Sequence, residues 1–302
     1  MSNLRQQLKA GGVVAPGAHD ALSAVLAERS GFNAVYLSGF AFEATQLGAP
    51  DMALSTMSEL AAHAARMVEA TSAEVICDID TGFGGPNSVR RTIHAFERAG
   101  VAAVQIEDQA EPKRCPFLGG RQVLERSAAV ARVRTAVEAR RSDDLMIIAR
   151  TDADEISTQE VVERSRLYAE AGADLVMPMV RNLDGRPITD RTPAERMEIY
   201  ADLVQRIAHP IVVLDPPPGF TAQDVLDLGV AMVIMPLASL EAATTALLGY
   251  YEAVHGSGHS GRYFSDHPKK LAADLQMMRL LGLDDYLSRE AGSEPSLHPD
   301  RG

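Results

Sequence analysis

Acidic side chains are concentrated where two short apolar runs of the chain end. Asp78 and Asp80 lie at the end of one run, and Glu107 and Asp108 lie at the end of the next. Residues two apart on an extended chain point to the same side, so Asp78 and Asp80 could bind one cation. Carboxylates that leave positions for water and substrate suit Mg²⁺ or Mn²⁺. We therefore expect a divalent-metal site, the alternative being that one aspartate caps a helix and the other turns the loop.

A cysteine lies in the polar stretch that follows the second acidic pair. Cys115 comes directly after Lys113 and Arg114, whereas Cys77 lies within an apolar run. Cationic neighbours lower the pKa of a thiol, so we interpret Cys115 as a candidate acid or nucleophile. The alternative is a surface cysteine in a basic turn.

Two further positions could bind an anionic substrate. Arg150 follows an apolar run and could make a bidentate contact with a carboxylate or phosphonate, the alternative being a salt bridge to a neighbouring acid. At another such position Tyr36 is followed by Ser38, Gly39 and Phe40, which offer a hydroxyl and an unobstructed backbone amide. Such a turn can hold an oxyanion, although an ordinary loop fits equally well.

These residues lie at the ends of a repeated strand-and-helix pattern. Short runs rich in β-branched residues predict eight strands, over residues 13–15, 34–37, 75–78, 102–106, 145–149, 173–177, 211–214 and 231–235. Segments of helical period lie between them, among them residues 58–69, 87–99, 124–139 and 159–171. This alternation predicts an α/β protein with a (β/α)₈ barrel, in preference to an open doubly wound sheet. A barrel would bring the strand-end residues together at one mouth.

Length and charge narrow the classes of function. The 302 residues are 46% hydrophobic, enough for one large domain. The net charge of −12 and the lack of a Lys/Arg-rich run argue against a nucleic-acid partner. Two cysteines, no apolar signal segment and no apolar stretch of about 18 residues lead us to expect a cytoplasmic protein without a membrane partner.

Two regions depart from the repeat. Residues 181–192 are too polar and turn-rich for a helix, so we expect an extended loop after the sixth strand. We expect the barrel domain to span residues 1–255 and a C-terminal helical extension and tail to span residues 256–302. Within the extension, residues 268–287 have an apolar helical face that needs a partner surface, for which a neighbouring subunit is the candidate.

The order of the motifs resembles that of the isocitrate lyase and phosphoenolpyruvate mutase superfamily. The motifs are Tyr36-Leu-Ser-Gly, Leu47-Gly-Ala-Pro-Asp51, Asp78-Ile-Asp80-Thr-Gly-Phe-Gly, Gln105-Ile-Glu-Asp-Gln109, Pro112-Lys-Arg-Cys115 and Ile148-Ala-Arg-Thr-Asp-Ala153. The resemblance covers about residues 17–240 and is nearest to the methylisocitrate and dimethylmalate lyase branch. It implies a barrel whose eighth helix is exchanged between the subunits of a homotetramer or dimer of dimers.

The resemblance also assigns roles to residues of this chain. Asp80 would ligate Mg²⁺ directly, and three more carboxylates would ligate it or hold its water shell: Asp51, Asp78 and Glu107. The oxyacid end of the substrate would contact Ser38, Gly39 and Phe40. Arg150 would bind a carboxylate, and Lys113 and Cys115 would lie on a mobile loop, with Cys115 as the acid that protonates the carbanion. Tyr36 would share the role of base.

Together these features predict a Mg²⁺-dependent carbon–carbon lyase. Its substrate would be a 2-hydroxy or 2-oxo acid, cleaved to an oxoacid such as pyruvate or glyoxylate plus a carboxylate. Removal of the hydroxyl proton breaks the adjacent bond, and the metal stabilises the charge that develops. The enzymatic alternatives are an oxaloacetate-type decarboxylase and a phosphonopyruvate-type C–P bond enzyme. The alternative of another class is a non-catalytic barrel that binds an oxoacid.

Three strand ends depart from the family pattern on one side of the mouth. The lyases follow their loop cysteine with Gly-His, whereas this chain has Pro116-Phe117. Met179 stands where the family usually has a glutamate, and Asp215 lies where Ala-Asn is usual. We therefore expect a substrate other than isocitrate or methylisocitrate, with fewer carboxylates or a more apolar substituent.

Overall fold

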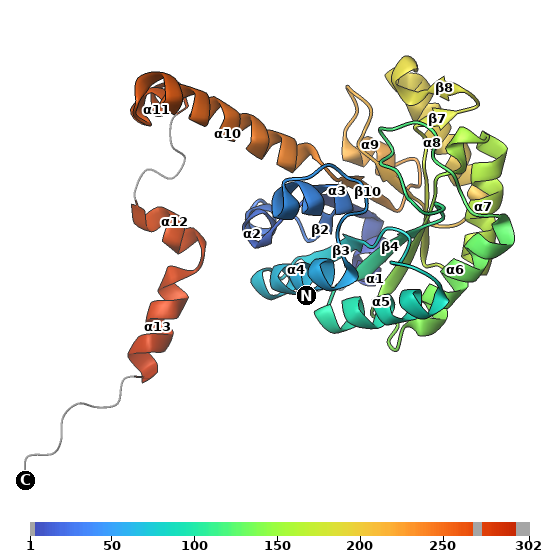
Figure 1. Cartoon of the computed structure of the whole chain (residues 1–302), viewed down its shortest axis with the longest axis horizontal. Helices are drawn as coiled ribbons and strands as arrows, with labels where there is room; N and C mark the ends of the chain where they lie inside the picture. Colours follow the sequence, from blue (N-terminus) through green and yellow to red (C-terminus); the bar gives the residue numbers. More distant parts are fainter. Residues whose placement is uncertain (1–3, 268–273, 294–302) are drawn as a thin grey trace, which may run out of the picture. The chain divides into compact units, whose positions relative to one another are not determined.

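The computed structural model describes residues 4–267 and 274–293, and strands and helices alternate along most of this length (Figure 1). Eight parallel strands form its centre: β1 (Val13–Pro16), β2 (Ala34–Leu37), β3 (Glu74–Asp78), β4 (Ala103–Glu107), β5 (Met146–Thr151), β6 (Leu175–Pro178), β9 (Val212–Leu214) and β10 (Met232–Met235). All eight correspond to the predicted runs. No strand end differs from its predicted position by more than two residues.

The strands form a closed ring. One sheet has the order β2-β3-β4-β5-β6 and the other has the order β1-β10-β9. Parallel bridges join the two sheets on both sides, between Gly17 and Tyr36 and between Val176 and Ile211. The predicted (β/α)₈ barrel is confirmed, whereas the exchange of its eighth helix between subunits stays a prediction.

Helices alternate with the strands along the chain (Figure 1). They are α1 (Leu4–Gly11), α2 (Ala21–Arg29), α3 (Gly39–Phe42), α4 (Met57–Ala70), α5 (Pro86–Ala99), α6 (Arg126–Ala139), α7 (Thr158–Glu170), α8 (Pro193–Ile207), α9 (Ala222–Leu226) and α10 (Ala238–Ser257). Capping boxes begin α4 at Thr56 and α8 at Thr192, where the hydroxyl accepts the backbone N–H three residues on. The four helices predicted by residue range are present as α4 to α7.

Alternation along the strands decides which side chains reach the mouth. In β3, Val75 and Cys77 pack outward in one apolar cluster with Leu60 and Phe96 of the surrounding helices. Ile76 instead belongs to the cluster inside the ring. Side chains alternate across a strand, so Asp78 also faces inward, at the carboxyl end of the strand. The polar residues that follow the apolar runs therefore converge.

The segment after β6 differs from the predicted extended loop. It forms a small hairpin of β7 (Asn182–Leu183) and β8 (Arg186–Pro187), followed by the 3₁₀ helix η3 (Ile188–Asp190). Asp184 and Gly185 connect the two strands with φ angles of 55° and 75°. Two residues with positive φ fit the right-handed twist of a hairpin, and Asp-Gly is a common sequence for such a turn. The hairpin begins directly after Arg181.

The described residues divide into two compact units between Glu241 and Ala242. The second contains most of α10, with α11 (Gly261–Asp266), α12 (Asp274–Leu280) and α13 (Leu283–Ser293). Of the helical pattern predicted over residues 268–287, residues 268–273 lie outside the described residues, and a break at Gly282 divides the rest. The predicted domain boundary at residue 255 stays a prediction. None of the described helices is long and apolar enough to cross a membrane.

Candidate active site

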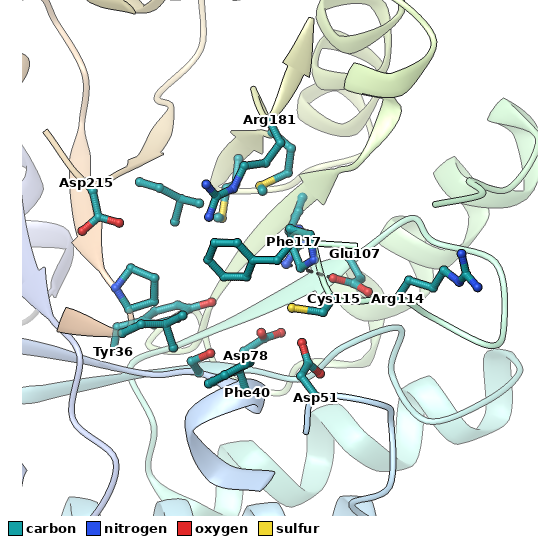
Figure 2. Close-up of a pocket in the computed structure, with 18 of the residues that line it drawn as sticks. Tyr36, Phe40, Asp51, Asp78, Glu107, Arg114, Cys115, Phe117, Arg181 and Asp215 are labelled. Carbon is teal, nitrogen blue, oxygen red and sulfur yellow. Dashed lines mark ion pairs between the residues drawn. The ribbon is translucent and has the colours of Figure 1, made fainter. Parts of the chain in front are cut away.

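A pocket lies at the carboxyl ends of the barrel strands (Figure 2). Its volume of about 200 Å³ suits a small organic acid rather than a nucleotide. Nine of the predicted site residues line it: Tyr36, Ser38, Phe40, Asp51, Asp78, Glu107, Lys113, Cys115 and Arg150. The remaining two, Gly39 and Asp80, lie directly beside these. The structure therefore brings every predicted site residue to one place.

Four carboxylates are buried around one ammonium group. Lys113 Nζ lies 2.5 Å from Asp51 Oδ1 and 2.8 Å from Asp80 Oδ1. Asp78 and Glu107 complete the set, and both are buried. The Lys113 side chain is only 5% exposed, so solvent does little to screen these charges. In this arrangement Lys113 supplies positive charge to the acidic cluster.

Backbone and side-chain donors hold the Asp78 carboxylate of the acidic cluster in place. The N–H groups of Gly39 and Asp80 donate to the Asp78 carboxylate over 3.5 and 3.0 Å, and Gln105 Nε2 donates over 3.0 Å. A Cβ atom at Gly39 would lie 3.1 Å from Asp80 Oδ1. Glycine is therefore needed here because the α3 backbone approaches two carboxylates closely.

Asp51 is positioned by a residue that sequence reasoning missed. Glu43 begins the π-helix η1 (Glu43–Leu47) and is 1% exposed. Its carboxylate accepts the backbone N–H groups of Met52, Leu54 and Ser55 over 2.9, 2.6 and 2.9 Å. The loop after Asp51 is thereby held to the rim of the barrel. The sequence offered one signal for this role: Glu43 is the single acidic residue in the stretch Phe40-Ala-Phe-Glu-Ala.

The electrostatics of the acidic cluster favour an additional cation. Burial, Asp78 and Asp51 raise the pKa of Asp80 to about 7 despite Lys113, and burial raises the pKa of Asp78 and of Glu107. Glu107 Oε1 has no hydrogen-bond donor among the described residues. Buried oxygen donors with excess negative charge fit Mg²⁺ or Mn²⁺.

The same carboxylates are not arranged as a coordination sphere. Within the described part of the chain, no three Asp, Glu, His or Cys side chains are grouped as metal ligands. The Lys113 ammonium lies between Asp51 and Asp80, so it occupies space that a cation would need. The donor set therefore fits a metal, provided that Lys113 moves.

Arg150 is held by two acids on the inner face of the barrel. Its Nη1 lies 3.0 Å from Glu107 Oε2 and its Nη2 lies 2.7 Å from Asp152 Oδ1. The predicted alternative for Arg150, a salt bridge to a neighbouring acid, is thus present. Arg150 Nε is buried and has no acceptor among the described residues. Arg150 therefore keeps an unpaired N–H donor at Nε.

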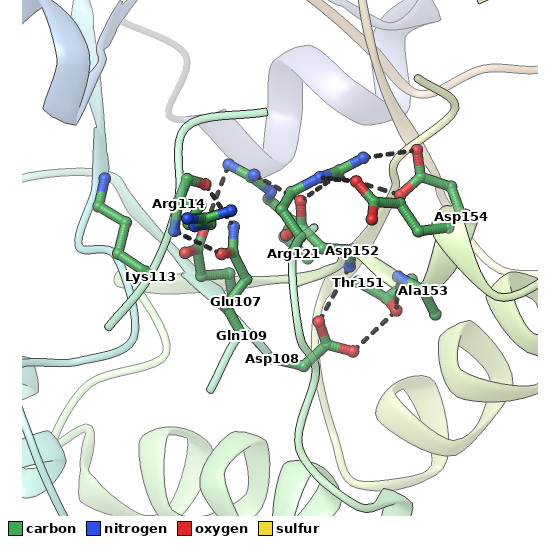
Figure 3. A network of polar contacts seen from close by, with 12 residues as sticks. Glu107, Asp108, Gln109, Lys113, Arg114, Arg121, Thr151, Asp152, Ala153 and Asp154 are labelled. Atoms are coloured by element: carbon green, nitrogen blue, oxygen red, sulfur yellow. Dashed lines mark hydrogen bonds and ion pairs between the residues drawn. The ribbon is translucent and has the colours of Figure 1, made fainter. Parts of the chain in front are cut away.

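A second arginine, Arg121, binds the same oxygen of Asp152 as Arg150 does (Figure 3). Arg121 Nη1 lies 2.6 Å from Asp152 Oδ1 and 3.1 Å from Asp154 Oδ1. Burial would raise the pKa of Asp152, but Arg150 and Arg121 outweigh it, and the pKa is lowered. Arg121 follows the Cys115 loop, so this ion-pair network anchors one end of that loop beside Arg150.

The Cys115 thiol points into the pocket with Asp51 and Asp78 (Figure 2). Its pKa is raised to about 11, chiefly by burial and further by Asp51. The expected lowering by cationic neighbours is wrong because the charge of Lys113 is paired with acids and Arg114 is exposed. A buried thiol of this pKa is protonated at neutral pH, which suits an acid better than a nucleophile.

Tyr36 is a hydrogen-bond donor as the structure has it. Its phenol donates to Gln105 Oε1 over 2.5 Å and is fully buried beneath the pocket. Burial and the nearby Asp78 raise its pKa well above the usual 10. The phenol is therefore protonated at neutral pH.

The side of the pocket that departs from the family contains an unexpected cation. Met179 is buried and apolar, as its residue type predicts. Two residues further on, Arg181 also lines the pocket, with its guanidinium carbon 4.2 Å from the centre of the Phe117 ring. Sequence reasoning missed Arg181 because it assigned the whole segment to a loop. A positive charge therefore lies near the position where the family glutamate is absent.

Comparisons with known proteins agree with this geometry. A family model described as phosphoenolpyruvate phosphomutase matches residues 4–255. An isocitrate lyase of Haloferax volcanii is 37% identical over 279 residues, which are 88% of this chain and 80% of that protein. A solved 2,3-dimethylmalate lyase, a member of the PEP mutase/isocitrate lyase superfamily, has a TM-score of 0.83 and 31% identity, covering 98% of this chain and 97% of that chain. A phosphonopyruvate hydrolase solved with oxalate and Mg²⁺ has a TM-score of 0.81 and 27% identity, covering 95% and 96%.

Proposed function

The chain belongs to the phosphoenolpyruvate phosphomutase family and is a carbon–carbon lyase, and we propose that it cleaves a 2-hydroxy or 2-oxo acid with the help of Mg²⁺. The products would be an oxoacid such as pyruvate or glyoxylate and a carboxylate. One observation supports this most strongly: a protonated thiol, an acidic cluster and an arginine face the same small pocket.

The metal would be held by the acidic cluster of Asp51, Asp78, Asp80 and Glu107. The solved phosphonopyruvate hydrolase contains Mg²⁺ and oxalate, which supports a cation and an oxyacid in a related site. When bound, Mg²⁺ would supply positive charge that binds oxygens of the substrate and stabilises developing negative charge, and Mn²⁺ suits the same ligands. Lys113 would leave its position between Asp51 and Asp80 and remain close enough to orient the substrate.

The other end of the pocket would position the substrate. Arg150 would bind a substrate carboxylate through its free Nε, while Glu107 and Asp152 hold its other nitrogens. The substrate's oxyacid group would contact Ser38, Gly39 and Phe40. Tyr36 is protonated as it stands, so it would donate a hydrogen bond to the substrate and would share the role of base only if its pKa fell in the complex.

Cys115 would act as the acid. When the bond between the second and third carbons of a 2-hydroxy acid breaks, its electron pair goes to the third carbon and the hydroxyl loses its proton as the carbonyl forms. The Cys115 thiol would transfer its proton to the third carbon. The hydroxyl proton would pass to solvent, and a proton from solvent would then return the thiolate to its resting form. A raised thiol pKa keeps this proton available at neutral pH.

We propose a cytoplasmic homotetramer or dimer of dimers as the working form. Two unpaired cysteines suit a reducing compartment. Large apolar side chains on α10 are exposed in the single chain: Leu247, Leu248 and Tyr251. Such residues support an additional protein partner for this helix.

Proton NMR of the purified protein with Mg²⁺ would test the reaction directly. The panel would contain malate, 2,3-dimethylmalate, oxaloacetate and phosphonopyruvate, with Cys115→Ser and EDTA as controls. Formation of an oxoacid and a second carboxylate, lost in both controls, is the expected result. Loss of CO₂ or phosphate that survives Cys115→Ser would instead favour a decarboxylase or C–P bond enzyme. Binding without turnover of any acid would favour a non-catalytic barrel.

A further inference from the structure

Arg181 differs from the other cations of the pocket in having no acid partner. Four cationic side chains line the pocket: Lys113, Arg114, Arg150 and Arg181. Lys113 and Arg150 are each ion-paired with two acids. Arg114 is exposed and donates to the Gly119 carbonyl. Among the described residues, no carboxylate lies within ion-pair distance of Arg181.

The surroundings of Arg181 fix its plane and leave its nitrogens available. The Phe117 ring covers one face of the guanidinium at 4.2 Å, and stacking of this kind does not use the N–H donors. Arg181 Nε is buried and has no acceptor among the described residues. Figure 2 shows the guanidinium directed into the pocket, with Asp215 on the far side. A planar set of donors therefore faces the space where substrate would lie.

Arg181 keeps its positive charge in these surroundings. Burial lowers its pKa, Asp215 and Cys115 oppose that effect, and Arg121 adds to it. An arginine remains charged at any physiological pH even after such a shift. A partly buried cation without an acid partner gains more than a fully exposed one when a ligand supplies an anion. The structure thus has a place for a negatively charged group beside Phe117.

The proposed reaction requires a second acidic group in the substrate. The electron pair left on the third carbon is stabilised when that carbon carries a carboxylate, which then accumulates additional negative charge. Arg150 is assigned to the first carboxylate, at the metal end. Arg181 stacks on Phe117, two residues from Cys115, so it lies near the thiol that protonates the third carbon.

We propose that Arg181 binds the second carboxylate of the substrate, the one attached to the carbon that Cys115 protonates. This inference rests on the proposed function and deepens it, because it makes Arg181 the residue that selects a 2-hydroxy dicarboxylate over a monocarboxylate. A 2-hydroxy dicarboxylate still has fewer carboxylates than the tricarboxylates isocitrate and methylisocitrate, so this inference is compatible with the expectation drawn from the sequence. Met177 and Met179 also line the pocket and would give an apolar substituent of the same substrate an apolar surface to contact.

A binding cycle would test this inference separately from turnover. Calorimetry with Mg²⁺ would measure the affinity for malate and for lactate, a 2-hydroxy acid that lacks the second carboxylate. We expect the wild type to bind malate about 10- to 100-fold more tightly than lactate, the range of a charge-assisted hydrogen bond. Arg181→Gln should remove most of this preference and leave lactate affinity unchanged, and Arg181→Lys should keep part of it.

Arg186→Gln is the matched control. Arg186 lies in the hairpin that follows Arg181, is exposed and pairs with Glu195 outside the pocket, so the preference for malate should persist. A wild type without preference for malate, or a preference that survives Arg181→Gln, would overturn the assignment. Loss of lactate affinity in Arg181→Gln would also overturn it, since that result indicates a structural role. Failure of the NMR assay would refute the lyase reaction and leave this binding result interpretable.

Discussion

Replacement of Lys113 by methionine tests the arrangement of the acidic cluster. Methionine keeps much of the side-chain volume and removes the ammonium that lies 2.5 Å from Asp51 and 2.8 Å from Asp80. The variant would leave the buried carboxylates of the acidic cluster with Arg150 as their nearest cation. Metal-free protein should therefore be destabilised, and Mg²⁺ should bind without having to displace an ammonium group.

The size of the effect follows from the burial of the pair. Removing one partner of a buried ion pair costs about 3–5 kcal/mol because the other charge is left uncompensated. For a chain of this size, 1 kcal/mol corresponds to about 2 °C in melting temperature, so metal-free Lys113→Met should melt about 6–10 °C below the wild type. The deficit should shrink near pH 5, where the carboxyls take up protons.

Thermal unfolding with EDTA and with increasing free Mg²⁺ would measure both quantities, and calorimetry would give the Mg²⁺ affinity. Each tenfold gain in Mg²⁺ affinity adds about 1.4 kcal/mol to the free energy of unfolding with bound Mg²⁺. The increase in melting temperature caused by Mg²⁺ therefore grows by about 3 °C. Lys9→Met, at an exposed position of α1, is the matched control and should change neither value. Equal Mg²⁺-induced rises in the wild type and Lys113→Met would refute a metal site between Asp51 and Asp80.

Four further predictions concern the same pocket. Cys115→Ser should lower turnover by about 10²- to 10⁴-fold in the NMR assay while oxalate affinity is retained; unchanged turnover would remove the thiol from the mechanism. Mg²⁺ affinity measured by calorimetry should rise between pH 6 and 8, because the pKa of Asp80 near 7 makes metal and proton compete. The pKa of Asp80 is about 7 in the folded protein and 3.8, the ordinary aspartate value, in the unfolded chain. Between these pH values only the folded protein keeps the proton, so the stability of metal-free protein should fall as the pH rises from about 4 to 7. Glu43→Gln should weaken Mg²⁺ binding and lower the free energy of unfolding in urea by about 1–3 kcal/mol, whereas Glu69→Gln on the exposed side of α4 should change neither.

The sequence predicted the scaffold well because each strand is marked by local composition. Eight β-branched runs with helical segments between them correspond to the eight barrel strands. Parallel strands in a barrel share one carboxyl edge, so residues as distant in sequence as Tyr36 and Arg150 were expected to meet. Both line the pocket.

The sequence predicted less about charge and local geometry. The basic residues beside Cys115 suggested a lowered thiol pKa, but burial and the pairing of Lys113 with acids reverse the direction. Which cation pairs with which acid depends on distances across the barrel, and no local pattern encodes them. Arg181 and Glu43 were missed for the same reason, since the role of each comes from a tertiary contact.

The turn of the hairpin after β6 could have been predicted from the sequence, but its two short strands could not. Asp184-Gly185 is a favoured two-residue turn, but the flanking segments have only two paired residues each, too few for a recognisable alternation. Assignment to an extended loop hid the position of Arg181, which the hairpin holds beside the barrel mouth.

The position of Lys113 also has a consequence for how the protein would acquire the proposed metal. Because the chain contains its own counter-ion, the barrel can complete folding before any metal arrives. Loading would then be an exchange of one cation for another at a finished site. It would require a shift of the loop that contains Lys113 rather than an opening of the barrel. Thermodynamic linkage makes the exchange reciprocal: whatever draws this loop away from the acidic cluster strengthens metal binding, and metal binding favours the displaced loop by the same free energy.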